Sequence, residues 1–377
     1  MTIKPVLSGS GLWKPQHVIT NEELVVAYNA YAEKFNAENS EEIESGGVEA
    51  KARSSAAFIE KASGIRARYA YVKDGILDID RMRPKIPPRP ESELSHQAEI
   101  ALNAAHIALA DANKDASEVD AVIVSCAYTE RSYPAIAIEV QGALGIKGFG
   151  FDMLVACSAA TFALQRAYEM VMAGTADCVL VINPELTSPQ VNYRDRDSHF
   201  IFGDISTATI IESDRTCRSE HSYEILGTRA ETVFSNNIRS NFGYITRATD
   251  DDPYGIDKLF HQQGRNVFKD VCPLAANHIT DHLERLELTP QDLKRWWLHQ
   301  ANLNMNLLIS KRLLGRQATA EEAPIVLDEY ANTASAGSLI AFNLYHKDLL
   351  QGDLGVICSF GAGYSIGSLV LEKRAIV

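Results

Sequence analysis

The chain has 377 residues, of which 46% are hydrophobic and 23% charged, and its formal net charge is −13. This length allows two domains of ordinary size or one duplicated pair. A nucleic-acid binder needs a concentrated basic face, so the acidic balance argues against one. The six cysteines show no CxxC spacing, which indicates a reducing compartment rather than a disulfide framework. Without a leader-like start or an apolar run of ~18 residues, we expect a cytoplasmic protein with no membrane span and no signal peptide.

The first part of the chain alternates ordered and irregular segments. Thr20 and Asn21, followed by two glutamates, form a good helix start, and the helix is expected to pass Tyr31. Residues 36–55 are polar and weakly periodic, which is typical of an inserted helix and loop. A second inserted segment, 72–94, contains a basic proline-rich stretch that excludes a helix or a central strand.

The rest of the chain alternates strands and helices. We expect strands at 121–126, 150–156, 178–183, 208–212, 223–232, 295–299 and 355–359 and a last strand through 371, with helices at 95–112, 135–144, 264–286, 302–314 and 335–350 and one directly after Cys157. This order predicts an α/β fold with largely parallel sheets. It divides into an N-terminal half, 1–212, and a C-terminal half, 213–377.

Cys157 lies where an apolar strand passes into a helix. The free N–H groups and the positive dipole at a helix start are expected to stabilise a thiolate there, which suggests a nucleophile. A buried, unreactive thiol is an equal alternative on this stretch alone, because free cysteine is among the most buried residue types.

Two further segments carry polar residues at the ends of strands. His299 follows an apolar strand, and Asn332 lies in a loop before a helix. Sites in α/β sheets gather beyond the carboxyl ends of strands, so these residues and Cys157 are expected to converge. In a thiol protease the histidine deprotonates the cysteine and the asparagine orients the ring. In a condensing enzyme both instead donate hydrogen bonds to a thioester oxygen.

Three other patterns are interpreted as structural. Residues 363–367 fit the hydrolase pattern G-x-S-x-G, but no histidine follows, so they predict a turn into the last strand. His278 and His282 are four residues apart on a helix, without a third ligand, and are expected on a solvated face rather than at a metal. Arg196, between two aspartates, is expected at the surface.

An ordered set of motifs, spread over nearly the whole chain, resembles one family. The motifs are Ser8–Gly11 with Thr20-Asn21, Gly64–Arg68, Leu144–Ile146, Ala156–Ser158, Phe202–Asp204, Gly264–Lys269, His299–Asn302, Asn332–Ser335 and Phe360–Gly363. The chain is similar to β-ketoacyl-acyl carrier protein synthases of class III, in the thiolase superfamily. This implies a thiolase-like fold, with two similar βαβαβ-type halves in five αβαβα layers, and a homodimer. It also implies an acyltransferase of fatty acid biosynthesis that condenses an acyl thioester with malonyl-acyl carrier protein.

The resemblance assigns roles to matching residues. Cys157 takes the acyl group, and the N–H groups of Cys157 and Ala362 form the oxyanion hole. His299, as a neutral imidazole, and Asn332 hold the malonyl thioester oxygen while carbon dioxide leaves. Metal and separate cofactors are not expected, since coenzyme A or acyl carrier protein arrives as part of the thioester substrates.

Substrate contacts follow from the same resemblance. Where relatives clamp the adenine of coenzyme A with tryptophan and arginine, this chain has Phe58 and Ala62, with Lys61 adjacent. Tyr133 matches a residue that closes the partner subunit's acyl pocket. Gly361 and Gly363 form the turn beside the substrate. Lys269, Lys311, Arg312 and Arg316 are expected to dock the acidic carrier protein.

The insertions at 36–55 and 72–94 suggest a deeper acyl tunnel and a starter longer than acetyl. Several alternatives stay open from the sequence. They are a condensing enzyme of specialised metabolism on the same fold, of a polyketide, quinolone-like or head-to-head type, a non-catalytic partner subunit, and a thioester hydrolase.

Overall fold

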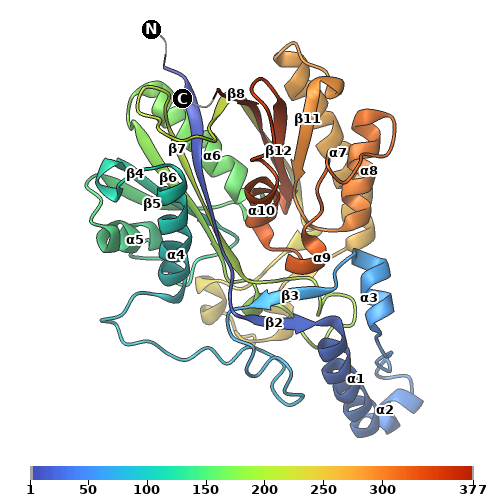
Figure 1. The fold of residues 1–377 in the computed structure, drawn as a ribbon. Coiled ribbons are helices and arrows are strands. Elements are labelled where there is room, and N and C mark those ends of the chain that lie inside the picture. Colours follow the sequence, from blue (N-terminus) through green and yellow to red (C-terminus); the bar gives the residue numbers. More distant parts are fainter. Residues whose placement is uncertain (1–2, 376–377) are drawn as a thin grey trace.

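The computed structural model describes residues 3–375, and one mixed sheet of nine strands runs through it (Figure 1). The strand order is β11-β12-β13-β8-β1-β7-β6-β4-β5. The strands are β1 (Pro5–Trp13), β4 (Ala121–Cys126), β5 (Phe149–Leu154), β6 (Cys178–Glu185), β7 (Ile205–Ser213), β8 (Tyr223–Ser235), β11 (Leu293–Leu298), β12 (Leu354–Gly361) and β13 (Gly363–Lys373).

The sheet consists of two halves with similar pairing patterns, and the N-terminal half has one more parallel strand. From β1 outward, β7 and β6 follow antiparallel, and β4 and β5 follow parallel. From β8 outward, β13 and β12 follow antiparallel, and β11 follows parallel. β1 and β8 join the halves antiparallel, with Val6 opposite Glu224 and Leu7 opposite Tyr223. The repeated pattern is a structural duplication, and we propose the division at 212/213, beside the last residue of β7.

Helices cover the sheet in layers (Figure 1). α6 (Ala159–Ala173) and α10 (Gly337–Leu344) lie between the halves, α4 (His96–Asp111) and α5 (Ile136–Leu144) cover the N-terminal half, and α7 (Gly264–Arg285) and α8 (Leu303–Leu314) cover the C-terminal half. Three apolar cores fill the spaces, one around α6 and α10 and one under each outer pair. Strands buried on both faces are continuous apolar runs, as in β4 and β6. The predicted five-layered α/β fold is confirmed.

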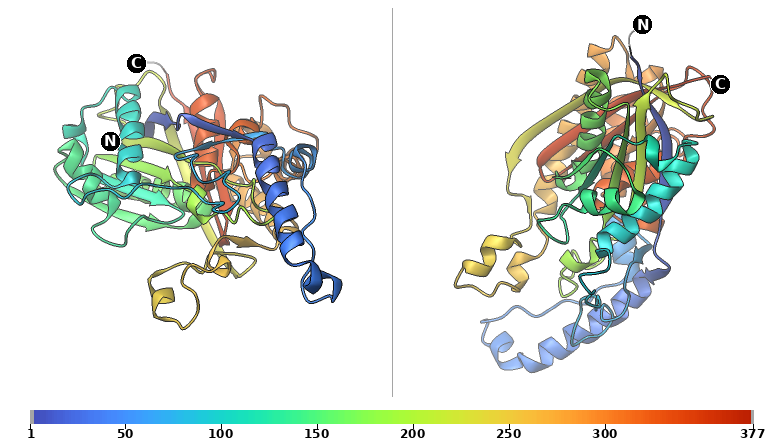
Figure 2. Two further views of the ribbon diagram at one scale, coloured as in Figure 1. Left: turned by 90° about the horizontal axis from the view of Figure 1, so that it is seen from below. Right: turned by 90° about the vertical axis from the view of Figure 1, so that its left-hand side faces the viewer.

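A smaller unit of short elements lies at one end of the sheet. It contains β2 (His17–Thr20), β3 (Ala67–Ala70), α1 (Asn21–Glu38), α2 (Ser40–Glu44), α3 (Ala56–Ser63) and α9 (Leu327–Tyr330) around a fourth apolar core. The start of α1 is fixed by a capping box between Thr20 and Glu23. Figure 2 shows α1 and α2 extending from the body at this end, together with the segment 240–259. That segment connects the two-residue strands β9 (Ile238–Arg239) and β10 (His261–Gln262).

The inserted segments have different structures. Residues 36–55 form the end of α1, all of α2 and a loop, in agreement with the prediction. Residues 72–94, which the structure describes throughout, have turns and bends but no helix or strand. Among the described residues, no helix combines the length and the apolar character that a membrane span requires.

Three expectations were wrong. The sheet is not largely parallel, because five of its eight strand pairings are antiparallel and only three are parallel. β12 and β13, for example, are separated by Ala362 alone, and so short a connection permits only an antiparallel pair. The helix predicted over 335–350 ends at Leu344, because the backbone carbonyl of Tyr345 turns away to accept hydrogen bonds from the side chains of Arg295 and Trp297. His278 and His282 do not lie on a solvated face. Both are buried between α7 and β13, where they bond the hydroxyl of Ser368 at 3.0 and 2.7 Å.

Candidate active site

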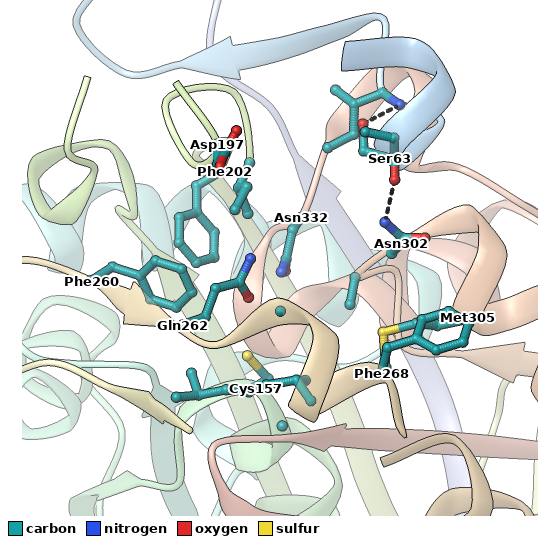
Figure 3. Close-up of a pocket in the computed structure, with 18 of the residues that line it drawn as sticks. Ser63, Cys157, Asp197, Phe202, Phe260, Gln262, Phe268, Asn302, Met305 and Asn332 are labelled. Atoms are coloured by element: carbon teal, nitrogen blue, oxygen red, sulfur yellow. Dashed lines mark hydrogen bonds between the residues drawn. The ribbon is translucent and has the colours of Figure 1, made fainter. Parts of the chain in front are cut away.

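A cavity of about 700 Å³, here called the Cys157 cavity, lies where the two halves meet the smaller unit (Figure 3). Cys157, His299 and Asn332 all line it, although they are far apart in the sequence. Figure 3 shows the Cys157 sulfur and the Asn332 amide directed into the same space. The rest of its wall is mainly apolar and includes Phe58, Phe200, Phe202, Ile238, Phe260, Val267, Phe268, Met305 and Phe360.

Cys157 lies in a tight turn between β5 and α6. The preceding residue, Ala156, has a φ of +44°, a conformation that costs energy for a residue with a Cβ and that is common at functional sites. The backbone N–H groups of Ala362 and of Cys157 itself donate toward the sulfur and favour its thiolate. Burial, followed by the negative charge of Glu185, outweighs these groups and raises the pKa of the thiol to about 12. The sequence predicted a thiolate at Cys157, but in the unliganded protein this side chain is a protonated thiol.

The turn at Gly361, Ala362 and Gly363 is fixed against Cys157 by close packing. A Cβ added to Gly361 would lie 2.4 Å from the Cβ of Cys157, so only glycine fits there. The hydroxyl of Ser365 donates to the carbonyl of Ala362 at 2.8 Å, and the hydroxyl of Ser158 donates to the carbonyl of Ser365 at 2.7 Å. These bonds hold the Ala362 N–H at the sulfur. G-x-S-x-G is the start of β13, as predicted.

His299 follows β11 and is buried. Its backbone N–H donates to the carbonyl of Cys358 at 2.8 Å, and its ring packs edge-on against Phe360 with 5.3 Å between centroids. Burial lowers the pKa of the imidazole to about 3. The ring is therefore neutral at physiological pH, and one of its nitrogens carries a proton that it can donate.

Asn332 is held in a strained loop that fixes the direction of its amide. Ala331 has φ +59° and ψ −161°, and Ala334 has φ +48°. The backbone N–H of Asn332 donates to the carbonyl of Ile201 at 2.9 Å, and its carbonyl accepts from Gly203 at 3.1 Å. Its side-chain Oδ1 accepts from the N–H of Ala334 at 2.9 Å. The Nδ2 group is left as a donor on the other side of the amide.

Arg196 lies at the mouth of the Cys157 cavity, a position that no sequence pattern indicates. Its guanidinium carbon is 3.9 Å from the ring centroid of Phe58, a close cation–π contact, and both residues line the cavity. Its Nε also donates to the backbone carbonyl of Arg53. The interpretation of Arg196 as a mere surface residue was incomplete. Lys61, expected nearby as a substrate contact, is outside the lining.

Tyr133 is not part of the Cys157 cavity within one chain. Its side chain is 78% exposed and lines a second cavity of about 1660 Å³, together with residues 74–86 of the second insertion. The first insertion, 36–55, lines neither cavity, and Gly363 is also outside both linings. An added acyl tunnel from these insertions to Cys157 is thus not formed by one chain alone.

All four predicted docking cations are exposed, and α7 and α8, which carry three of them, also contribute Val267, Phe268 and Met305 to the cavity wall. Lys269 on α7 and Lys311 and Arg312 on α8 have no ion-pair partner among the described residues. Arg316 differs, because both of its terminal nitrogens bond the carboxylate of Glu322. Within residues 3–375, no group of three or more histidine, cysteine, aspartate or glutamate side chains is arranged to hold a metal ion.

Several lining residues carry no local sequence signal. Phe202 and Phe260 meet edge-to-face, with ring centroids 4.7 Å apart, and come from segments almost sixty residues apart. Gln262 places a polar amide beside Phe260 and Asn332 in Figure 3. The path of the chain between β8 and α7 brings Phe260 and Gln262 to the cavity, and the loop before β7 brings Phe202.

Comparison with known proteins agrees with this geometry. Residues 151–232 match the family model "3-Oxoacyl-[acyl-carrier-protein (ACP)] synthase III", and 283–373 match its C-terminal counterpart. The chain is 52% identical over 348 residues to β-ketodecanoyl-[acyl-carrier-protein] synthase of Pseudomonas aeruginosa, covering 92% of this chain and 99% of that protein. It is 30% identical to β-ketoacyl-[acyl-carrier-protein] synthase III of Caldanaerobacter subterraneus, covering 82% and 98%.

The fold has close solved counterparts. The crystal structure of 3-oxoacyl-(acyl carrier protein) synthase III from P. aeruginosa superimposes with a TM-score of 0.76, at 22% identity and 99% coverage of both chains. Together with the 52% identical relative, this settles the family resemblance that the motifs suggested. The chain belongs to the 3-oxoacyl-[acyl-carrier-protein] synthase III family of acyltransferases, which condense acyl thioesters.

Proposed function

We propose that this enzyme condenses a medium-chain acyl thioester of about eight carbons with malonyl-acyl carrier protein. The 52% identical relative is named for a β-ketodecanoyl product, which has ten carbons. Condensation with malonate adds two carbons, since the third leaves as carbon dioxide, so such a product requires an eight-carbon starter. A starter longer than acetyl agrees with the expectation from the sequence.

In the first half-reaction, the sulfur of Cys157 attacks the carbonyl carbon of the starter. The N–H groups of Cys157 and Ala362, which already donate toward the sulfur, stabilise the oxyanion of the tetrahedral intermediate. The carbon–sulfur bond to the carrier breaks, and the thiol proton of Cys157 ends on the departing carrier thiol. The products are acyl-Cys157 and a free carrier thiol.

In the second half-reaction, His299 and Asn332 bind the thioester oxygen of the malonyl group. Both can donate a hydrogen bond without carrying a charge. The imidazole is neutral because it is buried, and the amide presents its N–H group because its oxygen already accepts from Ala334. Loss of carbon dioxide leaves an enolate on that oxygen, and its carbon attacks acyl-Cys157. The carbon–sulfur bond to Cys157 breaks, a proton returns to the sulfur, and the β-ketoacyl thioester leaves. The convergence of Cys157, His299 and Asn332 on one cavity carries this proposal.

Coenzyme A is the proposed carrier of the starter. Phe58 and Arg196 at the cavity mouth offer an aromatic face and a guanidinium to a purine ring and its phosphates. Malonyl-acyl carrier protein is proposed to dock on Lys269, Lys311 and Arg312, because an acidic partner is attracted to exposed, unpaired cations. Arg316 contributes less, since Glu322 neutralises it. Lys61 stays a proposed contact outside the cavity.

A homodimer is proposed to complete the acyl end of the site. Tyr133 has a large aromatic side chain and is 78% exposed in one chain, and it lines the second cavity together with Leu154, the last residue of the edge strand β5. Exposed apolar groups at a sheet edge are typical of protein interfaces. We also propose a cytoplasmic location, where both thioester substrates are made.

The test is a panel of acyl-coenzyme A thioesters from two to sixteen carbons. Each is incubated with the enzyme, and the intact protein is weighed. We expect a mass gain on Cys157 that is largest near eight carbons, and malonyl-acyl carrier protein should then convert it to a β-ketoacyl product. Labelling only by acetyl would overturn the starter length. Release of free acid without malonyl donor would favour a hydrolase, and a head-to-head product without carbon dioxide release would favour that class of condensing enzyme.

A further inference from the structure

Glu185 is a buried carboxyl group that the mechanism above does not use. It ends strand β6, and its side chain is 1% exposed. One oxygen accepts hydrogen bonds from the backbone N–H of Ser335, at 3.1 Å, and from the Ser335 hydroxyl. The other accepts from the backbone N–H of Ala127 at 3.1 Å. In the described part of the chain no lysine or arginine pairs with it, so its charge is held by these three donors alone.

Ser335 connects Glu185 to the amide of Asn332. Ser335 and Asn332 belong to the same tight loop, in which Ala334 donates its N–H to Oδ1 of Asn332. Because Ala331 and Ala334 have positive φ angles, this loop keeps its shape only while its surroundings hold it. The two bonds from Ser335 to Glu185 attach the loop to the end of β6.

Glu185 also lies near Cys157, because the turn that carries the sulfur, Ala156–Ser158, packs against Ala334–Ala336, in which Ser335 bonds the Glu185 carboxyl group. Its negative charge raises the pKa of Cys157, second only to burial. The other titratable groups around it are Cys126, Tyr128 and Asp204. Burial raises the pKa of Glu185 to about 7, and the charge of Asp204 acts in the same direction. Above that pH the carboxylate is mostly ionised.

We propose that Glu185 is a positioning residue with two effects: it holds the loop that aims the Asn332 amide, and it places a negative charge beside the sulfur of Cys157. The inference rests on the roles assigned to Cys157 and Asn332 above. It predicts that removal of the charge alone changes the two half-reactions in opposite directions. A merely structural residue would slow both.

The test compares Glu185→Gln with the parent enzyme at pH 8. The rate of Cys157 alkylation by iodoacetamide measures its thiolate fraction and needs no substrate. We expect alkylation to be at least threefold faster in Glu185→Gln, because the repelling charge is gone. Release of carbon dioxide from malonyl-acyl carrier protein should fall about tenfold, because the amide of glutamine presents a donor where Ala127 also donates.

Ser335→Ala is the matched variant, since it removes one hydrogen bond to the carboxyl group and leaves that group in place. It should slow carbon dioxide release. Its alkylation rate should lie between those of the parent and Glu185→Gln, because the lost bond lowers the pKa of Glu185 and its absence leaves the carboxyl less ionised at pH 8. If Glu185→Gln does not fold, Ser335→Ala tests the loop. The parent's alkylation rate between pH 5.5 and 8.5 then tests the charge, and it should rise less steeply with pH as Glu185 ionises near pH 7.

Alkylation of Glu185→Gln at or below the parental rate, or carbon dioxide release within twofold of parent, overturns the proposal. If Glu185→Gln does not fold, the proposal is overturned by parental carbon dioxide release in Ser335→Ala. It is also overturned if the pH dependence of alkylation in the parent follows a single ionisation. A parent enzyme that releases no carbon dioxide from malonyl-acyl carrier protein contradicts the proposed function instead, and the alkylation measurements still test Glu185.

Discussion

Substitution of Gly361 by alanine should disable Cys157 without touching it chemically. The new Cβ would lie 2.4 Å from the Cβ of Cys157 and 3.1 Å from its sulfur. Carbon atoms in contact are separated by about 3.5–4.0 Å, so one of the two segments must move by about 1 Å. A displacement of about 1 Å at reacting atoms can cost about 10²-fold in rate. We therefore expect self-acylation of Gly361→Ala to be about 10²-fold slower than in the parent.

The assay is quenched-flow acylation followed by intact mass measurement, at saturating octanoyl-coenzyme A. Gly142→Ala is the matched control, because a Cβ there meets no atom within 4 Å. It should acylate at the parental rate. The thermal unfolding of both variants is measured in parallel, so that loss of fold is separated from loss of rate. Acylation of Gly361→Ala within threefold of the parent would refute the reasoning.

Three further predictions concern other parts of the molecule. His299→Ala should keep self-acylation and lose about 10²–10³-fold in carbon dioxide release, because one donor to the developing oxyanion is gone; a parental rate of release would contradict its role. Arg196→Ala should raise the KM for octanoyl-coenzyme A and not that for octanoyl-pantetheine, which has no purine to contact Phe58 and Arg196; equal changes would disprove the purine contact. Burial lowers the pKa of His346 to about 3, so its stabilising contribution is present above about pH 6.5 and is lost as the pH falls. The melting temperature of His346→Leu should therefore fall less between pH 7 and pH 5 than that of the parent, and an equal fall would contradict this.

Much of the fold follows from local patterns in the sequence. The apolar runs of β4 and β6 are strands buried on both faces, and their lengths limit them to strands. Thr20 with Glu23 marks the start of α1 within one turn. Such signals depend on neighbours within a few residues, and these are visible in the sequence. The convergence of Cys157 and His299 was predicted because each follows a strand and sites gather beyond the carboxyl ends of strands, whereas Asn332, which follows α9, was placed from a loop motif.

Long-range packing decides what the sequence did not show. Arg196 and Phe58 are separated by more than a hundred residues, and no sequence pattern links a residue of a polar loop to an aromatic residue on a distant helix. His278 and His282 have helical spacing that suits an exposed face equally well. Their burial depends on Ser368 of β13, which offers a hydroxyl to both. The pKa of Cys157 depends on burial and on Glu185, neither of which a helix start reveals.

The electrostatics of the cavity favour a division of charge between enzyme and substrate. Cys157 is a thiol, and His299 is a neutral imidazole, each because burial disfavours its charged form. An arriving malonyl group therefore brings its own negative charge into a wall with aromatic rings such as Phe202 and Phe260. In the proposed mechanism, loss of carbon dioxide moves that charge from the carboxylate to the thioester oxygen. There the two proposed donors, the His299 imidazole and the Asn332 amide, would meet it, and neither would have to change its protonation state. Donors that are already in place cost no reorganisation when the charge develops, so this arrangement stabilises the enolate more than the bound malonyl group.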